Sequence, residues 1–371
     1  MTEALRVGLV GYWSAGRGIH ARLLREVGAQ VVRVVSRNPA RATAAERDWP
    51  GVTVDPDLAT LLAHVDELDV VVIASPTGEH VDHVTRALAA GAYVVVDKPL
   101  ATSVEEAATS TRLDVEAGGR LTVFHNRRWD PEQLTLRAVL AAGELGTVHR
   151  FERRWERWRP VPQDRWKEND TRAGGLLLDL GSHLVDSAVQ LFGPVVRVYA
   201  ELSNLTTPAV DDVFLALTHA PRADGSSVIS HLQAGALVGA PGPRTRVLGS
   251  RGAYLVTSFE GEATPFSVLD EAVDAGVHAV PGTEAPDAAS GPAPGSGADE
   301  GAAHEGWLVH GSDRVPVRRV PGGHPDYYRA VEAWVRGTGP VPVDPADAVA
   351  TARVLDAALV SAREGRVVTL G

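Results

Sequence analysis

The first third of the chain alternates short runs of branched apolar residues with longer segments that favour helices. The apolar runs span residues 5–10, 31–36, 70–74, 93–96 and 121–124, and the helical segments span residues 16–27, 39–47, 78–90 and 103–117. Runs that are apolar on both faces are typical of strands buried in a parallel sheet. Because parallel strands are joined by helical crossovers, this alternation predicts a doubly wound α/β domain of the Rossmann type over residues 1–124.

A different pattern begins near residue 125. Longer strands are joined by turns rich in glycine and proline, with helices before, among and after them. The expected strands span 149–158, 195–202, 213–218, 228–234 and 245–249, and the expected helices span 131–142, 181–192, 324–336 and 345–364. This pattern predicts a second, α+β domain over residues 125–371 with a large, mostly antiparallel open sheet. Residues 281–304 are dominated by Pro, Gly, Ala and Ser and are expected to form a flexible surface loop.

Charge and composition narrow the possible partners. The chain of 371 residues has a formal net charge of −11, which argues against a nucleic-acid or anionic-membrane partner. It has no cysteine, so disulfides and thiolate metal sites are excluded. The first residues lack the pattern of a signal peptide, and the apolar runs are too short to span a bilayer. We therefore expect a cytoplasmic protein with a small-molecule ligand.

The segment after the first apolar run is a candidate dinucleotide site. It reads Gly11, Tyr12, Trp13, Ser14, Ala15 and Gly16. A dinucleotide fingerprint has a third glycine at the position of Trp13, where the backbone approaches the pyrophosphate. The amides of a helix that begins near Ser14 would still offer N–H donors to a phosphate. The motif alone also fits a ligand-free strand-to-helix turn.

The second strand predicts which dinucleotide is bound. NAD-binding domains end this strand in a carboxylate that binds the ribose 2′-hydroxyl. Here the strand ends in Ser36 and Arg37, which suit a 2′-phosphate. We therefore expect NADP to be preferred over NAD, although Arg37 could also be a solvated loop residue.

Several further stretches carry a resemblance to a known family. They are "VIASPTGEH" (72–80), "VVVDKPL" (94–100), "VFHNRRWD" (123–130), "GGLLLDLGSHLVDSAVQLFG" (174–193) and "RTRVLGSRGAY" (244–254). Their order and spacing resemble the Gfo/Idh/MocA family, which comprises glucose-fructose oxidoreductase, inositol 2-dehydrogenase and their relatives. The pattern is most similar to the scyllo-inositol dehydrogenase-like branch, and it extends over nearly the whole chain except residues 281–304.

This resemblance implies an NAD(P)-dependent oxidoreductase of sugars and polyols that forms a homo-dimer or homo-tetramer. The family's Glu-Lys-Pro motif corresponds to Asp97, Lys98 and Pro99, with aspartate in place of glutamate and a cis bond before the proline. Further cofactor contacts are implied for Ser75, Pro76, His80, Asp97 and Lys98.

The resemblance also implies that Lys98, Asp179 and His183 are catalytic, and the chemistry of these residues agrees. Hydride transfer from an alcohol needs a base for the hydroxyl proton, and histidine serves this purpose near neutral pH. A helix places Asp179 and His183 on one face. Lys98 follows a parallel strand, where its ammonium could hold the reacting oxygen. Without the family frame, a capping aspartate and a core histidine would be the more usual explanation of such a pair.

The remaining candidates concern the substrate. Expected substrate contacts are Lys98, Asn126, Arg127, Trp166, Asp179 and His183. Residues 151–160 interleave arginines with aromatic residues, and we interpret them as a strand whose far end reaches the substrate cleft. Surface ion pairing with Glu152 and Glu156 would explain this stretch equally well. His80, Asp82 and His83 look superficially like metal ligands, since a helix brings positions i and i+3 close together. No third ligand is evident for such a pair, so no metal is expected.

Two functional hypotheses follow from these observations. The first is an NAD(P)-dependent oxidoreductase acting on a sugar, sugar derivative or inositol-like polyol. The alternative is a non-catalytic binding or regulatory protein on the same fold, with a dinucleotide site impaired by Trp13.

Overall fold

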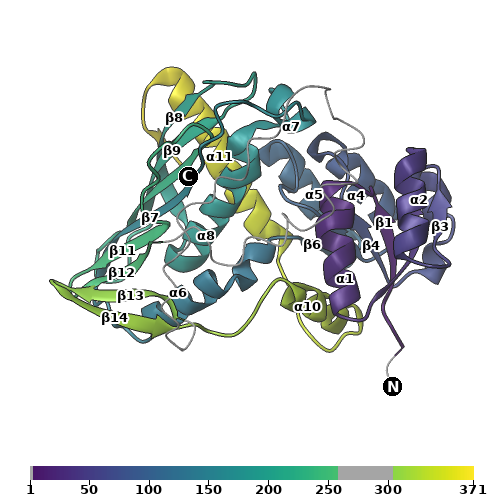
Figure 1. Ribbon diagram of the computed structural model, residues 1–371, viewed down its shortest axis with the longest axis horizontal. Helices are drawn as coiled ribbons and strands as arrows, with labels where there is room; N and C mark the ends of the chain where they lie inside the picture. Colours follow the sequence, from purple (N-terminus) through teal and green to yellow (C-terminus); the bar gives the residue numbers. More distant parts are fainter. Residues whose placement is uncertain (1–2, 258–303) are drawn as a thin grey trace, which may run out of the picture.

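The computed structural model describes residues 3–257 and 304–371, which form two sheets with helices around and between them (Figure 1). The first sheet has six parallel strands in the order β3-β2-β1-β4-β5-β6. Its strands are β1 (Arg6–Val10), β2 (Gln30–Val35), β3 (Thr53–Asp55), β4 (Val70–Ile73), β5 (Val94–Val96) and β6 (Leu121–Val123). The order reverses beside β1, as in a doubly wound sheet, and the predicted Rossmann-type fold is confirmed.

Helices connect these strands as the βαβ pattern requires. They are η1 (Gly16–Ala21), α1 (Arg22–Glu26), α2 (Pro39–Asp48), α3 (Leu58–Leu62), α4 (His80–Ala89) and α5 (Val104–Glu116), with short turns η2 (Val65–Glu67) and η3 (Thr77–Glu79). The sequence pattern did not reveal β3 or α3. Each is very short, and β3 lies at the sheet edge between Pro50 and Pro56, so neither shows a full period of apolar residues.

The second sheet has nine strands in the order β14-β13-β12-β11-β7-β10-β9-β8-β15. All neighbouring pairs are antiparallel except β7 and β10, which confirms the predicted mostly antiparallel sheet. The strands are β7 (Val148–Glu156), β8 (Val195–Ser203), β9 (Asp212–His219), β10 (Ile229–Gly235), β11 (Thr245–Gly249), β12 (Ala253–Val256), β13 (His304–His310), β14 (Asp313–Arg318) and β15 (Val368–Thr369).

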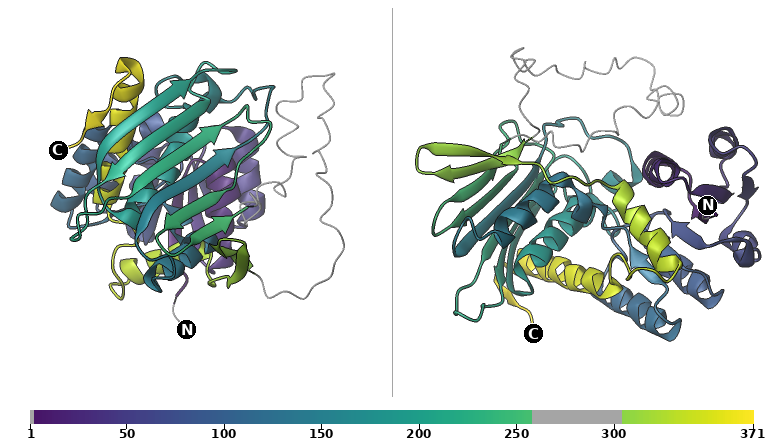
Figure 2. Two further views of the ribbon diagram at one scale, coloured as in Figure 1. Left: turned by 90° about the vertical axis from the view of Figure 1, so that its left-hand side faces the viewer. Right: turned by 90° about the horizontal axis from the view of Figure 1, so that it is seen from below.

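Helices cover one face of the second sheet. They are η4 (Asn126–Trp129), α6 (Pro131–Ala141), η5 (Leu177–Gly181), α8 (Ser182–Phe192) and α11 (Pro345–Glu364), and α7 (Trp166–Asn169) lies near the end of β7. Figure 1 shows α6, α8 and α11 between this sheet and the first domain, and Figure 2 shows the opposite face of the sheet without a helix over it. The covered face contributes alternate residues to the second core, as in β9, whose side chains alternate between buried and partly exposed.

The last helices connect the two domains. α10 (Pro325–Val335) inserts Tyr327, Tyr328 and Val331 into the first core, all of them fully buried. α11 packs against both α5 of the first domain and β8 of the second. The segment predicted as part of the C-terminal domain therefore also completes the core of the N-terminal one.

The predicted loop at residues 281–304 lies outside the described residues except for its last residue. His304 begins β13, so the predicted loop extends one residue too far. The sequence pattern also did not reveal β12–β15. β14 contains Pro316, which lacks a backbone donor and is tolerated here because β14 is an edge strand.

Candidate active site

The predicted cofactor residues meet at one edge of the parallel sheet. Residues 11–16, 36–37, 75–76 and 97–98 follow β1, β2, β4 and β5, which are adjacent strands in the order β2-β1-β4-β5. The carboxyl ends of parallel strands lie at the same sheet edge, and ligands of open α/β sheets bind there at the reversal of strand order. The sheet therefore assembles four separate sequence segments into one ligand-binding edge.

Both fingerprint glycines are required by their surroundings. Gly11 has a φ of +92°, and a Cβ there would lie 2.8 Å from the carbonyl oxygen of Ala74. A Cβ on Gly16 would lie 1.9 Å from the carbonyl oxygen of Gly11. The helix begins at Ser14, which is exposed, and the amides of a first helical turn lack partners within the helix. This close turn and open helix end fit the pyrophosphate of a dinucleotide.

The indole of Trp13 is directed toward α2. The guanidinium carbon of Arg41, in the first turn of that helix, lies 4.2 Å from the centre of the Trp13 ring. Since α2 follows Ser36 and Arg37, the indole lies on the side of the site expected for the adenine-bearing ribose. An indole in this position is compatible with a dinucleotide bound against residues 11–16. These residues therefore fit an NAD(P) cofactor.

Three side chains among the predicted cofactor residues are turned into the protein. Tyr12 is 2% exposed, and its hydroxyl donates to Asp48 Oδ2 at 3.0 Å. His80 is 1% exposed, and its ring nitrogens lie 2.9 Å from the Ser75 carbonyl oxygen and 2.8 Å from that of Pro99. Asp97 Oδ1 accepts the backbone N–H of Lys98 at 2.8 Å. These side-chain contacts hold the loops of the binding edge in place.

Lys98 connects the cofactor edge to the second domain. Its Nζ donates to the carbonyl oxygen of Asp179 at 2.7 Å and to Asp179 Oδ1 at 2.9 Å. Lys167, on α7, donates to the other carboxylate oxygen, Oδ2, at 2.7 Å. The Lys98–Pro99 bond is cis, as the resemblance implies. Asp179 is therefore the shared counterion of two lysines that come from different domains of the protein.

The charge state of Asp179 follows from these contacts. Burial alone would raise the pKa of its carboxyl, but Lys98 and Lys167 outweigh burial and hold this pKa well below its ordinary value. Asp179 is thus ionised at neutral pH. The ionised carboxylate holds both ammonium groups in place.

His183 is the second residue of α8 and lies four positions after Asp179. Its ring stacks on Trp155 with centroids 6.1 Å apart and an interplanar angle of 27°. Within the described part of the chain, its Nδ1 is sealed from solvent and has no hydrogen-bond partner. Burial, Lys98 and Arg127 hold the pKa of His183 well below its ordinary value. The imidazole is therefore neutral at neutral pH, the state in which it can accept a proton.

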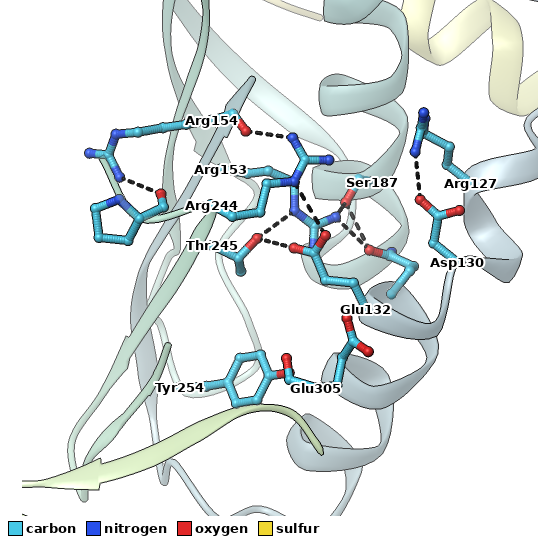
Figure 3. A network of polar contacts seen from close by, with 12 residues as sticks. Arg127, Asp130, Glu132, Arg153, Arg154, Ser187, Arg244, Thr245, Tyr254 and Glu305 are labelled. Carbon is cyan, nitrogen blue, oxygen red and sulfur yellow. Dashed lines mark hydrogen bonds and ion pairs between the residues drawn. The ribbon is translucent and has the colours of Figure 1, made fainter. Parts of the chain in front are cut away.

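A polar network that contains Arg127 and Arg244 contacts the Trp155 ring, and Figure 3 shows these two arginines with their polar neighbours. The guanidinium carbons of Arg127 and Arg244 lie 4.1 and 4.3 Å from the centre of the Trp155 ring. Glu132, on α6, accepts from Arg244 at 3.3 Å and pairs with Arg153 at 3.2 Å. Trp155 and Arg244 were not among the predicted site residues. The two-residue alternation of β7 was the signal that could have placed Trp155 on the face of the site.

The other predicted substrate residues occupy different environments. Arg127 pairs with Asp130 at 2.9 Å, and burial, which alone would raise the pKa of Asp130, is outweighed by Arg127 and His324, so this pKa falls to about 2. Asn126 is 6% exposed and contacts His324 at 3.2 Å. Trp166 is 45% exposed on α7, beside Lys167. Asn126 is therefore held inside the protein beside His324, and Trp166 lies at the surface next to the lysine that pairs with Asp179.

Two features of the described residues bear on other classes of function. They contain no group of three or more His, Cys, Asp or Glu side chains placed to hold a metal ion. No helix among them is both long and apolar enough to cross a membrane.

The fold and the site define an oxidoreductase with a nicotinamide-dinucleotide domain, and comparison with known proteins agrees. Residues 5–125 match the family model described as "Oxidoreductase family, NAD-binding Rossmann fold", and residues 133–255 match the "GFO/IDH/MocA C-terminal domain". The chain belongs to the Gfo/Idh/MocA family of NAD(P)-dependent oxidoreductases, and the predicted family is confirmed.

Three similar proteins span nearly the full chain. The uncharacterized oxidoreductase YdgJ of Escherichia coli (strain K12) is 33% identical over 98% of both chains. The scyllo-inositol 2-dehydrogenase (NADP(+)) IolW of Bacillus subtilis (strain 168) is 29% identical, covering 99% of this chain and 96% of its own. The solved structure of yvaA from Bacillus subtilis superposes with a TM-score of 0.80 at 28% identity, covering 100% of this chain and 99% of that one.

Proposed function

We propose that this oxidoreductase transfers a hydride between a nicotinamide cofactor and a hydroxyl or keto carbon of a sugar, sugar derivative or inositol-like polyol. The observation that carries the proposal is the contact between Lys98 and Asp179. It places an ammonium from the cofactor edge beside the helix that bears His183. A proton acceptor and a cation for the reacting oxygen are thus available close to one another.

The protein groups have separate roles in this proposal. His183, neutral at neutral pH, accepts the proton of the substrate hydroxyl. The Lys98 ammonium stabilises the negative charge that develops on the same oxygen. Asp179 orients that ammonium through two contacts, so Lys98 needs little rearrangement when the substrate is bound. The bound cofactor supplies the hydride acceptor for oxidation and the hydride donor for reduction.

We propose NADP as the preferred cofactor. Ser36 and Arg37 follow β2 where a carboxylate would otherwise bind the ribose 2′-hydroxyl, and Arg37 is exposed at that edge. The similar protein IolW is described as NADP(+)-dependent. Arg41 adds a second guanidinium on the same side of the site, over Trp13.

We also propose that the chain forms a homo-dimer or homo-tetramer through the face of the nine-stranded sheet that no described helix covers (Figure 2). Sedimentation at several protein concentrations tests this point. A species of one chain at all concentrations would contradict it.

The function is tested by titrating the purified protein with NADPH and with NADH while following tryptophan fluorescence. Turnover is then measured with NADP⁺ and a panel of aldoses, sugar derivatives and inositols. We expect NADPH to change the fluorescence at lower concentration than NADH, and at least one panel member to reduce NADP⁺. Binding of neither nucleotide would instead support a non-catalytic protein.

A further inference from the structure

Arg157 faces the candidate active site from the end of β7. Its N–H donates to the Gly235 carbonyl at 2.9 Å, and its carbonyl accepts from Val238 at 2.8 Å, so the chain stays extended beyond Glu156. Side chains alternate along extended chain. Arg157 therefore shares a face with Trp155, which is 2% exposed and stacks on His183, and lies opposite the 62% exposed Trp158.

Within residues 3–257 and 304–371, the Arg157 guanidinium makes no hydrogen bond or ion pair, and its central carbon lies 5.7 Å from the centre of the Trp155 ring. Arg154 and Arg246, on the other face of the same sheet, both pair with Glu152, at 3.0 and 2.6 Å. A part-buried cation without a partner among the described residues is unfavourable, so its retention beside the candidate active site points to an anionic ligand.

The surroundings of Arg157 strengthen its need for an anion. Burial and the neighbouring Arg159 lower the pKa of Arg157 to about 10, so it stays charged at neutral pH. Asp179 is the acidic group that opposes this shift, but its two carboxylate oxygens are already bound to Lys98 and Lys167. Arg165 is paired with Glu168. The site is thus locally cationic in a chain whose net charge is −11.

We propose that the substrate carries an anionic oxygen group, a carboxylate or a phosphate, and that Arg157 binds this group while the reacting carbon lies at Lys98 and His183. The inference rests on the hydride-transfer function proposed above and narrows its substrate class to acidic sugars or polyols. A guanidinium suits this task because its planar N–H groups bind two oxygens of a carboxylate or phosphate at once. Arg157 is then a specificity-determining residue.

The test compares three sugars that differ only at their terminal carbon: D-glucose, D-glucuronate and D-glucose 6-phosphate. Their binding to the purified protein is measured by calorimetry, and their KM and kcat are measured with NADP⁺. The variants are Arg157→Gln, Arg157→Lys as a partial rescue of charge, and Arg137→Gln as a control. Arg137 is exposed on α6, so its loss removes the same charge from the surface.

We expect at least one acidic sugar to bind the wild type about tenfold or more tightly than glucose, since hydrogen bonds to charged groups contribute this much or more. Arg157→Gln removes that preference, Arg157→Lys keeps part of it, and Arg137→Gln keeps all of it. NADPH affinity stays unchanged in all three variants. A preference for glucuronate identifies a carboxylate, and a preference for the 6-phosphate identifies a phosphate.

Other outcomes distinguish a failure of the proposed role of Arg157 from a failure of the proposed hydride-transfer function. Equal binding of the three sugars, binding of none, or an acidic preference that survives Arg157→Gln overturns the role of Arg157. A loss of NADPH affinity in Arg157→Gln also overturns the role of Arg157. Turnover of neutral polyols with a KM insensitive to Arg157→Gln also overturns it, while the hydride-transfer function stands. Arg157-dependent binding of an acidic sugar without hydride transfer to or from any compound contradicts the proposed function instead.

Discussion

The Nζ of Lys98 lies 2.9 Å from Oδ1 of Asp179, a residue 81 positions later in the chain and in the other domain. Lys98 follows β5 at the cofactor edge, and Asp179 lies one helical turn before His183. This ion pair fixes the distance between the cofactor edge and the proposed proton acceptor.

The pH dependence of oxidation is predicted to reflect a histidine, His183, that stays neutral at pH values where an ordinary histidine gains a proton. Burial, Lys98 and Arg127 lower the pKa of His183 below its ordinary 6.5. The neutral imidazole is the active base, so kcat/KM should remain constant as the pH falls through 6.5 and decrease only below it. Arg127→Gln removes one of these cations and should move the acid limb to higher pH.

Arg137→Gln serves as the control for that profile, because Arg137 is exposed on α6. It should leave the acid limb in place. A wild-type limb centred at or above 6.5 would contradict the neutral state of His183.

Trp13→Gly is predicted to change NADPH affinity by no more than about fivefold, because a cation–π contact that is partly open to solvent is worth about 1 kcal/mol. The indole lies against Arg41 on α2, a position compatible with a bound pyrophosphate. The change is measured by calorimetric titration. A gain of several orders of magnitude would mean that the native indole blocks the site.

Arg37→Ala is predicted to weaken NADPH binding by about 10- to 100-fold and to leave NADH binding nearly unchanged, since hydrogen bonds to charged groups contribute about 1.5–3 kcal/mol. Arg47→Ala is the matched control, because Arg47 is exposed near the other end of α2. Equal losses for both nucleotides in Arg37→Ala would show that Arg37 does not contact the 2′-phosphate.

Local sequence patterns predicted the architecture and the cofactor-binding edge of the candidate site. The apolar runs and the glycines at positions 11 and 16 depend on neighbours close in sequence or on backbone sterics, so the parallel sheet and its binding edge could be predicted. The pairing of Lys167 with Asp179 could not be predicted from the sequence, because it depends on how α7 packs after a long irregular connection.

Tertiary packing also decided two other features. The direction of the Trp13 indole depends on Arg41, which a strand and a helix separate from it in sequence. Tyr327 and Tyr328 lie in the first core although they are far along the chain, so their burial there could not be predicted from the sequence alone.

The most direct test of the account is the single-turnover rate of hydride transfer, followed by nicotinamide absorbance in protein saturated with NADP⁺ and its best substrate. His183→Asn and Lys98→Met should each slow this step by about 100-fold or more, the range for loss of a general base or of transition-state charge stabilisation. NADPH affinity should change by less than about threefold in His183→Asn, because His183 acts on the substrate rather than holding the cofactor. A wild-type rate in either variant would contradict the assignment of these two residues.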